Sequence, residues 1–217
     1  MALAIFDLDN TLIADDSDYL WGQFLVEKGV VDGAHYEREN RRFYDEYKNG
    51  TLDIMAFLAF SLKPLADNPI ETLNQWRTEF FKEKIEPNLL PTAMNSVDQH
   101  KTEGDHVMII TATNSFVTRP IADAYGIETL IATEPEWDGN QYTGRISGTP
   151  CFQSGKVERL ERWLQEHNQS MDGSYFYSDS HNDLPLLERV SHPVAVDADE
   201  KLTATAIERN CRQISFR

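Results

Sequence analysis

The sequence predicts an α/β protein built on a doubly wound parallel sheet, with an all-helical insertion near its start. Short apolar runs, each the length of a buried strand, alternate with amphipathic helical patterns, which is typical of a parallel sheet with helices on both faces. The interval between the first two runs, residues 7–106, is too long for an ordinary crossover and is helical in pattern. These observations indicate a core domain interrupted by a second domain.

Five apolar runs are predicted to form the core strands. They are residues 3–6, 107–110, 130–132, 175–177 and 194–196. The predicted helices between the later runs cover residues 116–125, a segment with Val157, Leu160 and Leu164 on one face and Trp163 beside it, and a segment from residue 184, where Pro185 suits a first turn. Residues 140–148 combine turn formers with alternating side chains, which predicts a small hairpin.

The interval after the first strand is predicted to be a helical cap. Apolar side chains recur there at helical spacing, as in Leu20, Phe24 and Leu25, and prolines separate the helical patterns. We therefore expect a cap domain at residues 15–88 and a core domain formed by residues 1–14 and 89–217. Because the insertion follows the first strand, the cap is expected to lie over the end of that strand.

Composition and charge disfavour several classes of protein. The chain has 217 residues, of which 41% are hydrophobic, but no apolar stretch approaches the roughly 18 residues that span a bilayer. No secretory signal is evident, and Cys151 and Cys211 lack metal-site spacing, so reduced thiols in a cytoplasmic protein are expected. The net charge of −16 disfavours nucleic acid as a partner. A monomer or homodimer without a membrane partner is expected.

Reactive side chains follow the ends of the main predicted strands. Asp7 and Asp9 flank one leucine after the first strand, and Thr111 follows the second. The fourth strand leads into residues 178–183, which are rich in Asp and Asn, and Lys156 opens a predicted helix. Because the carboxyl ends of parallel strands meet at one edge of a sheet, we expect these side chains to converge.

Each of these residues also has a structural role open to it. Asp7 and Asp9 could form the turn after a strand, and Thr111 could cap a helix. Residues 179–183 could supply turn and capping groups before a helix. Lys156 is harder to explain in this way, because a cation in the first helical turn opposes the helix dipole and indicates an anion nearby.

Taken as a set, the side chains predict a dication site that faces a phosphate site. Two carboxylates one residue apart are costly to hold together unless a cation or a proton lies between them. Hard oxygen ligands without a His or Cys cluster suit Mg²⁺. Thr111 and the backbone amides of Ala112 and Thr113, which we expect at a helix N-terminus, suit phosphate oxygens.

These residues resemble the four motifs of the haloacid dehalogenase-like phosphatases. The matching segments are residues 7–11 (Asp-Leu-Asp-Asn-Thr) for the first motif, DxDxT, then Thr111, Lys156 and residues 179–183 for the second, third and fourth. The resemblance covers the whole core and implies its Rossmann-like fold. The cap resembles that of the phosphoserine phosphatase-like branch, and residues 16–21 and 177–187 look closest to its histidinol-phosphatase subgroup.

The resemblance implies a Mg²⁺-dependent phosphatase of amino-acid biosynthesis that hydrolyses a small phosphorylated metabolite through an aspartyl-phosphate. Asp7 would be the nucleophile, and Asp9 would protonate the leaving oxygen and then activate water. Lys156 and Thr111 would bind the transferring phosphoryl group, with Asn182 on its oxygens. The implied metal ligands are Asp7, the backbone carbonyl of Asp9, Asp179 and, through water, Asp183.

The cap is expected to select the substrate, for which the resemblance favours histidinol phosphate or phosphoserine and leaves other small phosphomonoesters open. Phosphoserine phosphatases carry a glutamate near the substrate amine where this chain has Asp16, although acids also favour a helix N-terminus. Candidates to hold a serine carboxylate are Arg41, Arg42 and Lys48, none of them compelling. An acidic entrance with aromatic residues favours histidinol phosphate. Those aromatic residues are Tyr19, Trp21, Phe43 and Tyr44.

Other functions share parts of this pattern. A phospho-accepting signalling domain of the receiver type also combines a strand-end Asp, acidic metal ligands, a Thr and a Lys. Asp9 and the large cap argue against it, because a positioned acid and base drives turnover. Transfer of the phosphoryl group to another alcohol stays open, because it depends on how the cap admits an acceptor.

Overall fold

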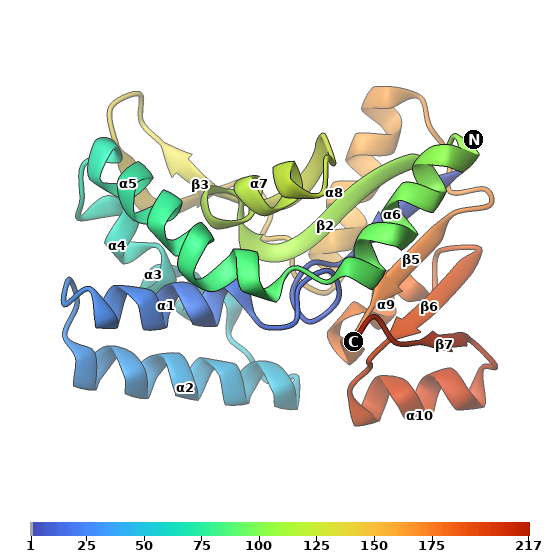
Figure 1. The fold of residues 1–217 in the computed structure, drawn as a ribbon, viewed down its shortest axis with the longest axis horizontal. Helices are drawn as coiled ribbons and strands as arrows, with labels where there is room; N and C mark the ends of the chain where they lie inside the picture. Colours follow the sequence, from blue (N-terminus) through green and yellow to red (C-terminus); the bar gives the residue numbers. More distant parts are fainter. Residues whose placement is uncertain (1) are drawn as a thin grey trace.

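A seven-stranded sheet forms the centre of the computed structural model, which describes residues 2–217 (Figure 1). The strands are β1 (Leu3–Phe6), β2 (His106–Asn114), β3 (Thr129–Trp137), β4 (Tyr142–Ser147), β5 (Tyr175–Ser178), β6 (His192–Val196) and β7 (Arg212–Ile214). Their order is β4-β3-β2-β1-β5-β6-β7, and every pair is parallel except β3–β4. The predicted α/β class with a parallel-dominated sheet is confirmed.

The strand order reverses beside β1. The chain moves from β1 through β2 and β3 to one edge of the sheet, and then returns to β5 on the other side of β1. In open α/β sheets, ligands bind outside the carboxyl ends of the strands at such a reversal. The topology therefore places the expected crevice at the end of β1, where Asp7 follows Phe6.

Helices cover both faces of the sheet, because strand side chains alternate between the faces. The core helices are α6 (Pro91–Glu103), α7 (Ser115–Ala124), α8 (Ser154–His167), the 3₁₀ turn η3 (His181–Asp183), α9 (Leu184–Leu187) and α10 (Glu200–Glu208). In β1, Ala4 and Phe6 pack in a hydrophobic cluster with α6, α7 and the inserted helices. Leu3 and Ile5 pack in a second cluster with α8, α9 and α10.

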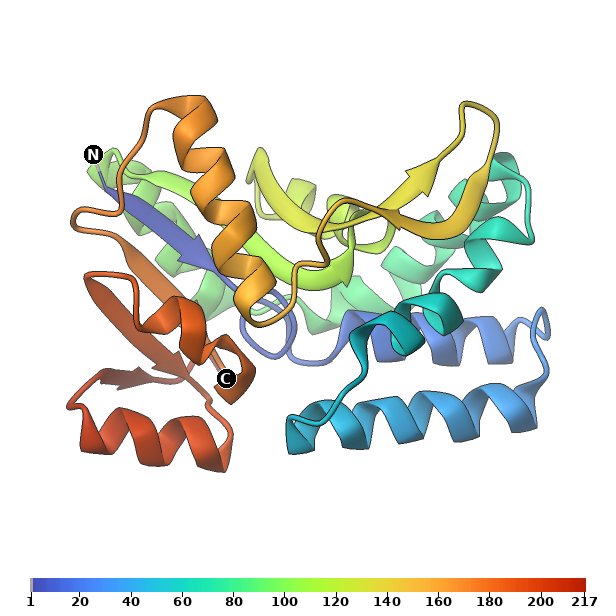
Figure 2. The same cartoon turned by 180° about the vertical axis from the view of Figure 1, so that it is seen from behind.

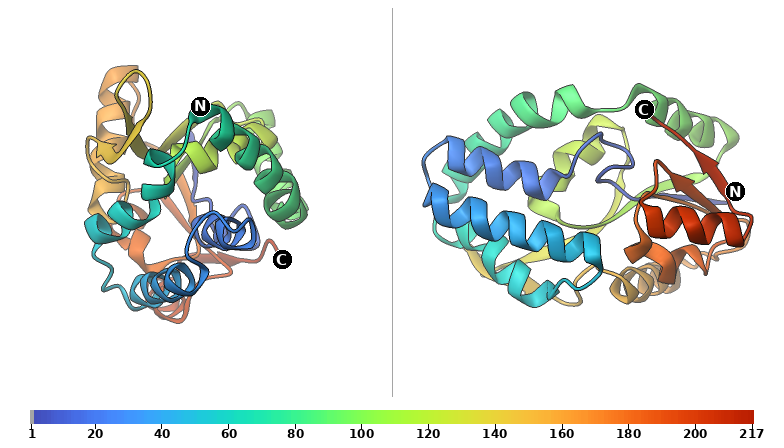
Figure 3. Two further views of the ribbon diagram at one scale, coloured as in Figure 1. Left: turned by 90° about the vertical axis from the view of Figure 1, so that its left-hand side faces the viewer. Right: turned by 90° about the horizontal axis from the view of Figure 1, so that it is seen from below.

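The segment between β1 and α6 is helical, as predicted from its periodicity. Its elements are α1 (Ser17–Glu27), α2 (Gly33–Asn49), α3 (Ile54–Ser61), α4 (Lys63–Ala66), α5 (Ile70–Phe80), the π-helical turn η1 (Phe81–Ile85) and the 3₁₀ turn η2 (Glu86–Asn88). Helices α1 and α2 lie side by side, and the C-terminal end of α2 approaches α10 (Figure 3). The division into domains at residues 15 and 88 stays a prediction.

The predicted hairpin lies elsewhere than expected. Its two arms are β3 and β4, and the chain reverses at residues 138–141, so residues 140–148 contain only the end of the turn and the second arm. The hairpin reaches past the sheet and packs on α3 and α4 (Figure 2). Gly144, with φ of +78°, lies so close to α4 that an added Cβ would be 3.3 Å from the Cβ of Ala66. The sequence did not reveal this contact because its partners are far apart in the chain.

Two linkers join the inserted helices to the core, and they run side by side. Ile13 forms an isolated antiparallel bridge with Leu89, and the amide of Ala14 donates to the carbonyl of Asn88 at 2.9 Å. The buried hydroxyl of Tyr125 accepts from the Leu90 amide at 3.1 Å and donates to a carbonyl of the other linker. Hydrogen bonds therefore hold the two linkers to each other and to Tyr125 of the core.

Other sequence predictions concern the cysteines and membrane spans. Cys151 is buried, Cys211 is partly exposed, and both are free thiols, as predicted. Within residues 2–217, no helix has the length and apolar character required to cross a membrane. Strand β7 was not predicted, because its few residues are mostly exposed and polar and pair only at the edge of the sheet.

Candidate active site

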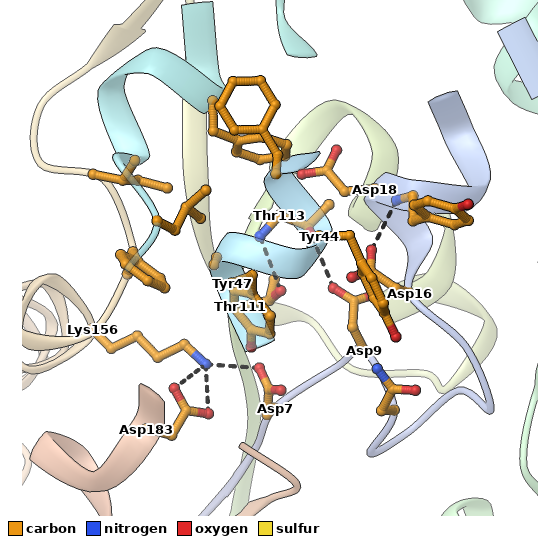
Figure 4. Close-up of a pocket in the computed structure, with 18 of the residues that line it drawn as sticks. Asp7, Asp9, Asp16, Asp18, Tyr44, Tyr47, Thr111, Thr113, Lys156 and Asp183 are labelled. Carbon is orange, nitrogen blue, oxygen red and sulfur yellow. Dashed lines mark hydrogen bonds and ion pairs between the residues drawn. The ribbon is translucent and has the colours of Figure 1, made fainter. Parts of the chain in front are cut away.

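A cavity lies where the ends of β1 and β2 meet α1, α2 and α3 (Figure 4). The residues that line it from the core include Asp7, Asp9, Thr111, Lys156 and Asp183. Their elements are far apart in sequence, but the parallel register of β1 with β2 and β5 brings the strand ends together. The structure therefore produces the convergence that the strand-end pattern predicts.

Lys156 is buried between two carboxylates. Its Nζ lies 2.8 Å from Oδ1 of Asp7 and 2.7 Å from Oδ1 of Asp183. Burial would lower the pKa of this lysine, but the charges of Asp183 and Asp7 raise it above its usual range. Burial raises the pKa of Asp7 to about 7, an effect that Lys156 opposes. A cation in the first turn of α8 indicated a nearby anion, and Asp7 and Asp183 are the anions found there.

Gly155 makes the position of Lys156 possible. A Cβ at this residue would lie 2.1 Å from the carbonyl oxygen of Pro150, a distance that no side chain tolerates. The absence of a side chain lets α8 begin against the preceding loop. The next residue then enters the site from the first turn of the helix.

Asp9 is held by two short hydrogen bonds from different parts of the chain. Its Oδ2 accepts from the hydroxyl of Thr113 at 2.8 Å, and its Oδ1 accepts from the amide of Ser17 at 2.7 Å. Burial raises the pKa of Asp9 to about 7, and the nearby charge of Asp16 adds to the shift. This carboxyl group can therefore carry a proton near neutral pH, which a general acid needs.

The site holds more carboxylates than Lys156 can neutralise. Asp179 accepts from the hydroxyl of Thr11 at 3.4 Å. Burial, followed by the charges of Asp7 and Asp183, raises the pKa of Asp179 well above its usual range. Crowded carboxylates of this kind are stabilised by a divalent cation, and oxygen donors suit a hard one. The acidic cluster is therefore compatible with a bound divalent metal.

A second group of ligand-type atoms, outside this site, is already satisfied. Atoms of His100, Glu103 and Asp105 lie within 4.8 Å of one another near the start of β2. One ring nitrogen of His100 lies 2.9 Å from Asp105, and the other lies 2.8 Å from the hydroxyl of Tyr177. Both histidine nitrogens are engaged, so this group is better explained as a structural network.

The expected helix N-terminus at Thr111 was wrong. Strand β2 continues to Asn114, where the register with β3 resumes, and the hydroxyl of Thr133 donates to the carbonyl of Ala112 at 2.7 Å. Helix α7 begins only at Ser115, with the Asn114 side chain as its cap. Thr111 is buried and lines the cavity, and its hydroxyl oxygen accepts from the amide of Thr113 at 3.2 Å.

Comparison with known proteins identifies the family. Residues 4–188 match the model of the haloacid dehalogenase-like hydrolases. The chain belongs to this family. The family that the motifs resemble is therefore confirmed, and with it the Rossmann-like fold and an enzyme of the phosphatase class.

Similar proteins cover the full length of this haloacid dehalogenase-like hydrolase. A protein of Neisseria meningitidis serogroup C named histidinol-phosphatase is 45% identical, and the alignment covers 99% of each chain. A protein of unknown function from Bordetella pertussis Tohama I is 42% identical, with a TM-score of 0.94 over 100% of this chain and 99% of that one. A substrate-bound phosphoserine phosphatase is 17% identical, with a TM-score of 0.72 over 100% of this chain and 93% of that one, and shares the fold.

Asn182 joins the inserted helices of this hydrolase to its core. Its Nδ2 donates to the carbonyl of Tyr47, near the end of α2, at 3.0 Å, and its Oδ1 accepts from Gln153 at 3.0 Å. A second hydrogen bond also joins α2 to the core: Nζ of Lys201 donates to the carbonyl of Asn49 at 3.0 Å. Asn182 is not among the residues that line the cavity, and its predicted contact with phosphoryl oxygens stays a prediction.

Asp16 has the helix-capping role that the sequence left open, while its contact with a substrate amine stays a prediction. Its Oδ1 accepts from the amide of Tyr19 at 2.8 Å and so caps α1. It also lines the cavity, where burial raises its pKa to about 6. Asp18, one residue into the same helix, lines the cavity as well, and sequence reasoning gave it no role in the site. Acids at a helix start have an ordinary explanation, so no local signal distinguished it.

Thr113 is predicted to position the proton carrier of this phosphatase. Thr113→Val removes the hydroxyl that Asp9 accepts from, so we expect kcat for an alkyl phosphate to fall about 10- to 100-fold. p-Nitrophenyl phosphate should lose less, because its leaving group needs no proton. Steady-state rates on both esters check this, with Thr113→Ser, which keeps the hydroxyl, as the control. Equal losses on the two esters would contradict the role.

Proposed function

We propose that this enzyme is a Mg²⁺-dependent phosphatase acting on histidinol phosphate through an aspartyl-phosphate at Asp7. The observation that carries the proposal is the lining of the cavity beyond the strand ends. The lining contains the acids Asp16 and Asp18. Of the described residues 2–217, Lys156 is the only lysine or arginine that lines the cavity, and it already bonds Asp7. A substrate with positive groups and no carboxylate fits this lining.

Phosphoserine fits the cavity less well, because its carboxylate would meet acids without a cation to balance it. The cap cations considered from the sequence lie outside the lining. Arg41 pairs with Asp45 at 3.7 Å, and Arg42 pairs with Glu39 at 3.0 Å. The Nζ of Lys48 lies 5.4 Å from the ring centroid of Tyr44, and the side chain of Lys48 is exposed.

The apolar part of the lining suits a flat ring. Aromatic side chains of α2, α3 and the loop before α8 face the cavity; they are Phe43, Tyr44, Tyr47, Phe57 and Phe152. An imidazole ring can stack on such side chains while its N–H groups bond to an acid. The 45% identity to the Neisseria protein named histidinol-phosphatase supports the same substrate.

The chain's own groups supply the nucleophile and the proton carrier for both halves of the reaction. An oxygen of Asp7 attacks phosphorus as the ester P–O bond breaks, and the proton of Asp9 goes to the leaving oxygen. Asp9 then takes a proton from water, whose oxygen attacks phosphorus, and phosphate leaves Asp7 free again. Lys156 and Thr111 bind the phosphoryl oxygens throughout.

The metal would be held by carboxylates already gathered at the strand ends. We assign Asp7, the carbonyl of Asp9 and Asp179 as direct ligands, and Asp183 as a ligand through water. Mg²⁺ there supplies positive charge that neutralises the phosphoryl oxygens. We further propose a cytoplasmic enzyme whose partner is a small metabolite; the expected monomer or homodimer stays a prediction.

Removal of the metal is expected to abolish turnover. After treatment with EDTA and gel filtration, phosphate release from histidinol phosphate should be at background, and Mg²⁺ should restore it. With Mg²⁺ present, kcat/KM for histidinol phosphate should exceed that for phosphoserine by about 100-fold, roughly the loss from one unpaired buried charge. A preference for phosphoserine, or turnover that survives metal removal, would contradict the proposal.

The same assay separates the alternative functions. A receiver-like domain would accumulate phosphorylated Asp7 without continuous phosphate release. A phosphotransferase would convert added alcohol, such as glycerol, into its phosphate ester in preference to releasing phosphate. Phosphate release equal to substrate consumed, with glycerol present, is the result that hydrolysis requires.

A further inference from the structure

Asp18 is the acid of the cavity whose hydrogen bonding is weakest. Its Oδ1 lies 3.5 Å from Nδ2 of Asn114, at the limit of a hydrogen bond, and its other hydrogen-bonding neighbour is the Thr113 hydroxyl, which donates to Asp9. Asp9 accepts two bonds of 2.8 Å or less, and Asp16 accepts one of 2.8 Å from a backbone amide. The carboxylate of Asp18 therefore has capacity left for a ligand.

The acids of the cavity lie at increasing distances from the proposed nucleophile, Asp7. In Figure 4, Asp7 and Lys156 lie at one side of the site, Asp16 lies beside Asp9, and Asp18 lies farthest from Lys156. The charge of Asp7 contributes to the raised pKa of Asp16. The raised pKa of Asp18 comes from burial and then from Asp16 and Asp9. Both observations indicate that Asp18 is the more distant acid.

Aromatic side chains line the same cavity as Asp18. Phe43 of α2 and Phe57 of α3 line the same space, and their ring centroids are 5.4 Å apart in an edge-to-face arrangement. A carboxylate in a cavity that aromatic rings also line is a suitable site for a flat group that donates a charged hydrogen bond.

We infer that Asp18 is a specificity-determining residue that binds the imidazole ring of the substrate, while Asp16 faces its amine. This inference rests on the proposed function. In histidinol phosphate the amine is carried two carbons from the phosphate ester oxygen, and the ring follows one carbon further along. The order phosphate, amine, ring matches the order Asp7, Asp16, Asp18.

A purely structural role for Asp18 leads to a different expectation. An acid in the first turn of α1 stabilises the helix through its dipole, and its loss would affect every substrate alike. Binding of the ring instead affects only substrates that have one. The ratio of two kcat/KM values measured on one protein separates these possibilities, because incomplete folding cancels in the ratio.

The test compares Asp18→Asn with Asp16→Asn on histidinol phosphate and on O-phosphoethanolamine, which has the amine but no ring. We expect Asp18→Asn to lower the ratio of kcat/KM, histidinol phosphate over O-phosphoethanolamine, about 10- to 100-fold, mainly through KM. Asp16→Asn keeps a helix-capping side chain, and it should lower both values together so that the ratio changes less than about threefold.

A ratio in Asp18→Asn equal to that of the wild type would overturn the inference, whether both values fall or neither does. If O-phosphoethanolamine turns over too slowly, the ratio of inhibition constants replaces the ratio of kcat/KM values. These constants are measured for histidinol and for ethanolamine as competitive inhibitors of p-nitrophenyl phosphate hydrolysis. Asp18→Ser replaces the asparagine variant if that one does not fold. Failure of the wild type to hydrolyse histidinol phosphate would instead overturn the proposed function, so the two failures are distinct.

Discussion

Asp7→Asn is expected to reduce phosphate release by at least about 10³-fold, because the amide oxygen is a poor nucleophile and cannot form the aspartyl-phosphate. The geometry makes this substitution a clean test. Asparagine has the shape of aspartate, so the contact of Lys156 with Asp183 at 2.7 Å can persist. The measurement is the initial rate with histidinol phosphate and with p-nitrophenyl phosphate in the presence of Mg²⁺.

Acid quenching during turnover separates loss of chemistry from loss of structure. The wild type should retain phosphate on the protein after a rapid quench with labelled substrate, and the variant should not. An unchanged circular dichroism spectrum shows that the fold is intact. Residual turnover within tenfold of the wild type, with the fold intact, would exclude Asp7 as the nucleophile.

Lys156→Met is expected to impair both stability and catalysis. The Lys156 side chain is 3% exposed and its ammonium group bonds two buried carboxylates, so its removal leaves Asp7 and Asp183 without the cation that balances them. Breaking such a buried pair typically costs about 3–5 kcal/mol in the free energy of unfolding. Catalysis should also fall by at least about 100-fold, because a cation on the phosphoryl group is lost. Urea unfolding with EDTA present, and initial rates with Mg²⁺, measure the two effects.

Lys63→Met is the matched control for stability. Lys63 pairs with Asp67 at 2.5 Å, but its side chain is 70% exposed, and exposed pairs contribute about 0–1 kcal/mol. The same chemical change should therefore alter the free energy of unfolding by less than about 1 kcal/mol. Equal effects of the two substitutions would show that Lys156 has no special part in holding the strand-end carboxylates.

The chemistry of the site could be predicted from the sequence because it depends on where strands end. Phe6 ends a short buried run, so Asp7 had to lie at the edge of a parallel sheet. Lys156, placed against the helix dipole, indicated an anion before its partners were known. Each of these signals is local, and each is visible in a few consecutive residues.

Contacts between segments far apart in the chain could not be predicted in this way. Thr113 bonds Asp9, and Asn182 bonds the carbonyl of Tyr47, across long separations in sequence. The continuation of β2 to Asn114 depends on its pairing with β3, which overrides the helix start that Thr111 suggested. No local pattern records such partners, because hydrogen bonds form wherever folding brings a donor to an acceptor.

By itself, the sequence determined the reaction class: strand-end acids, a hydroxyl and a lysine converge because parallel strands end at one edge. Only the tertiary structure decided which hydrogen-bonding atoms of each polar group remain free to bind a ligand. One oxygen of Asp16 accepts a hydrogen bond that caps α1, and the amide of Asn182 donates one that joins the inserted helices to the core. Asp18, in contrast, faces the cavity. The reason is physical: a buried polar group binds whichever partner packing supplies, and packing is a property of the whole fold.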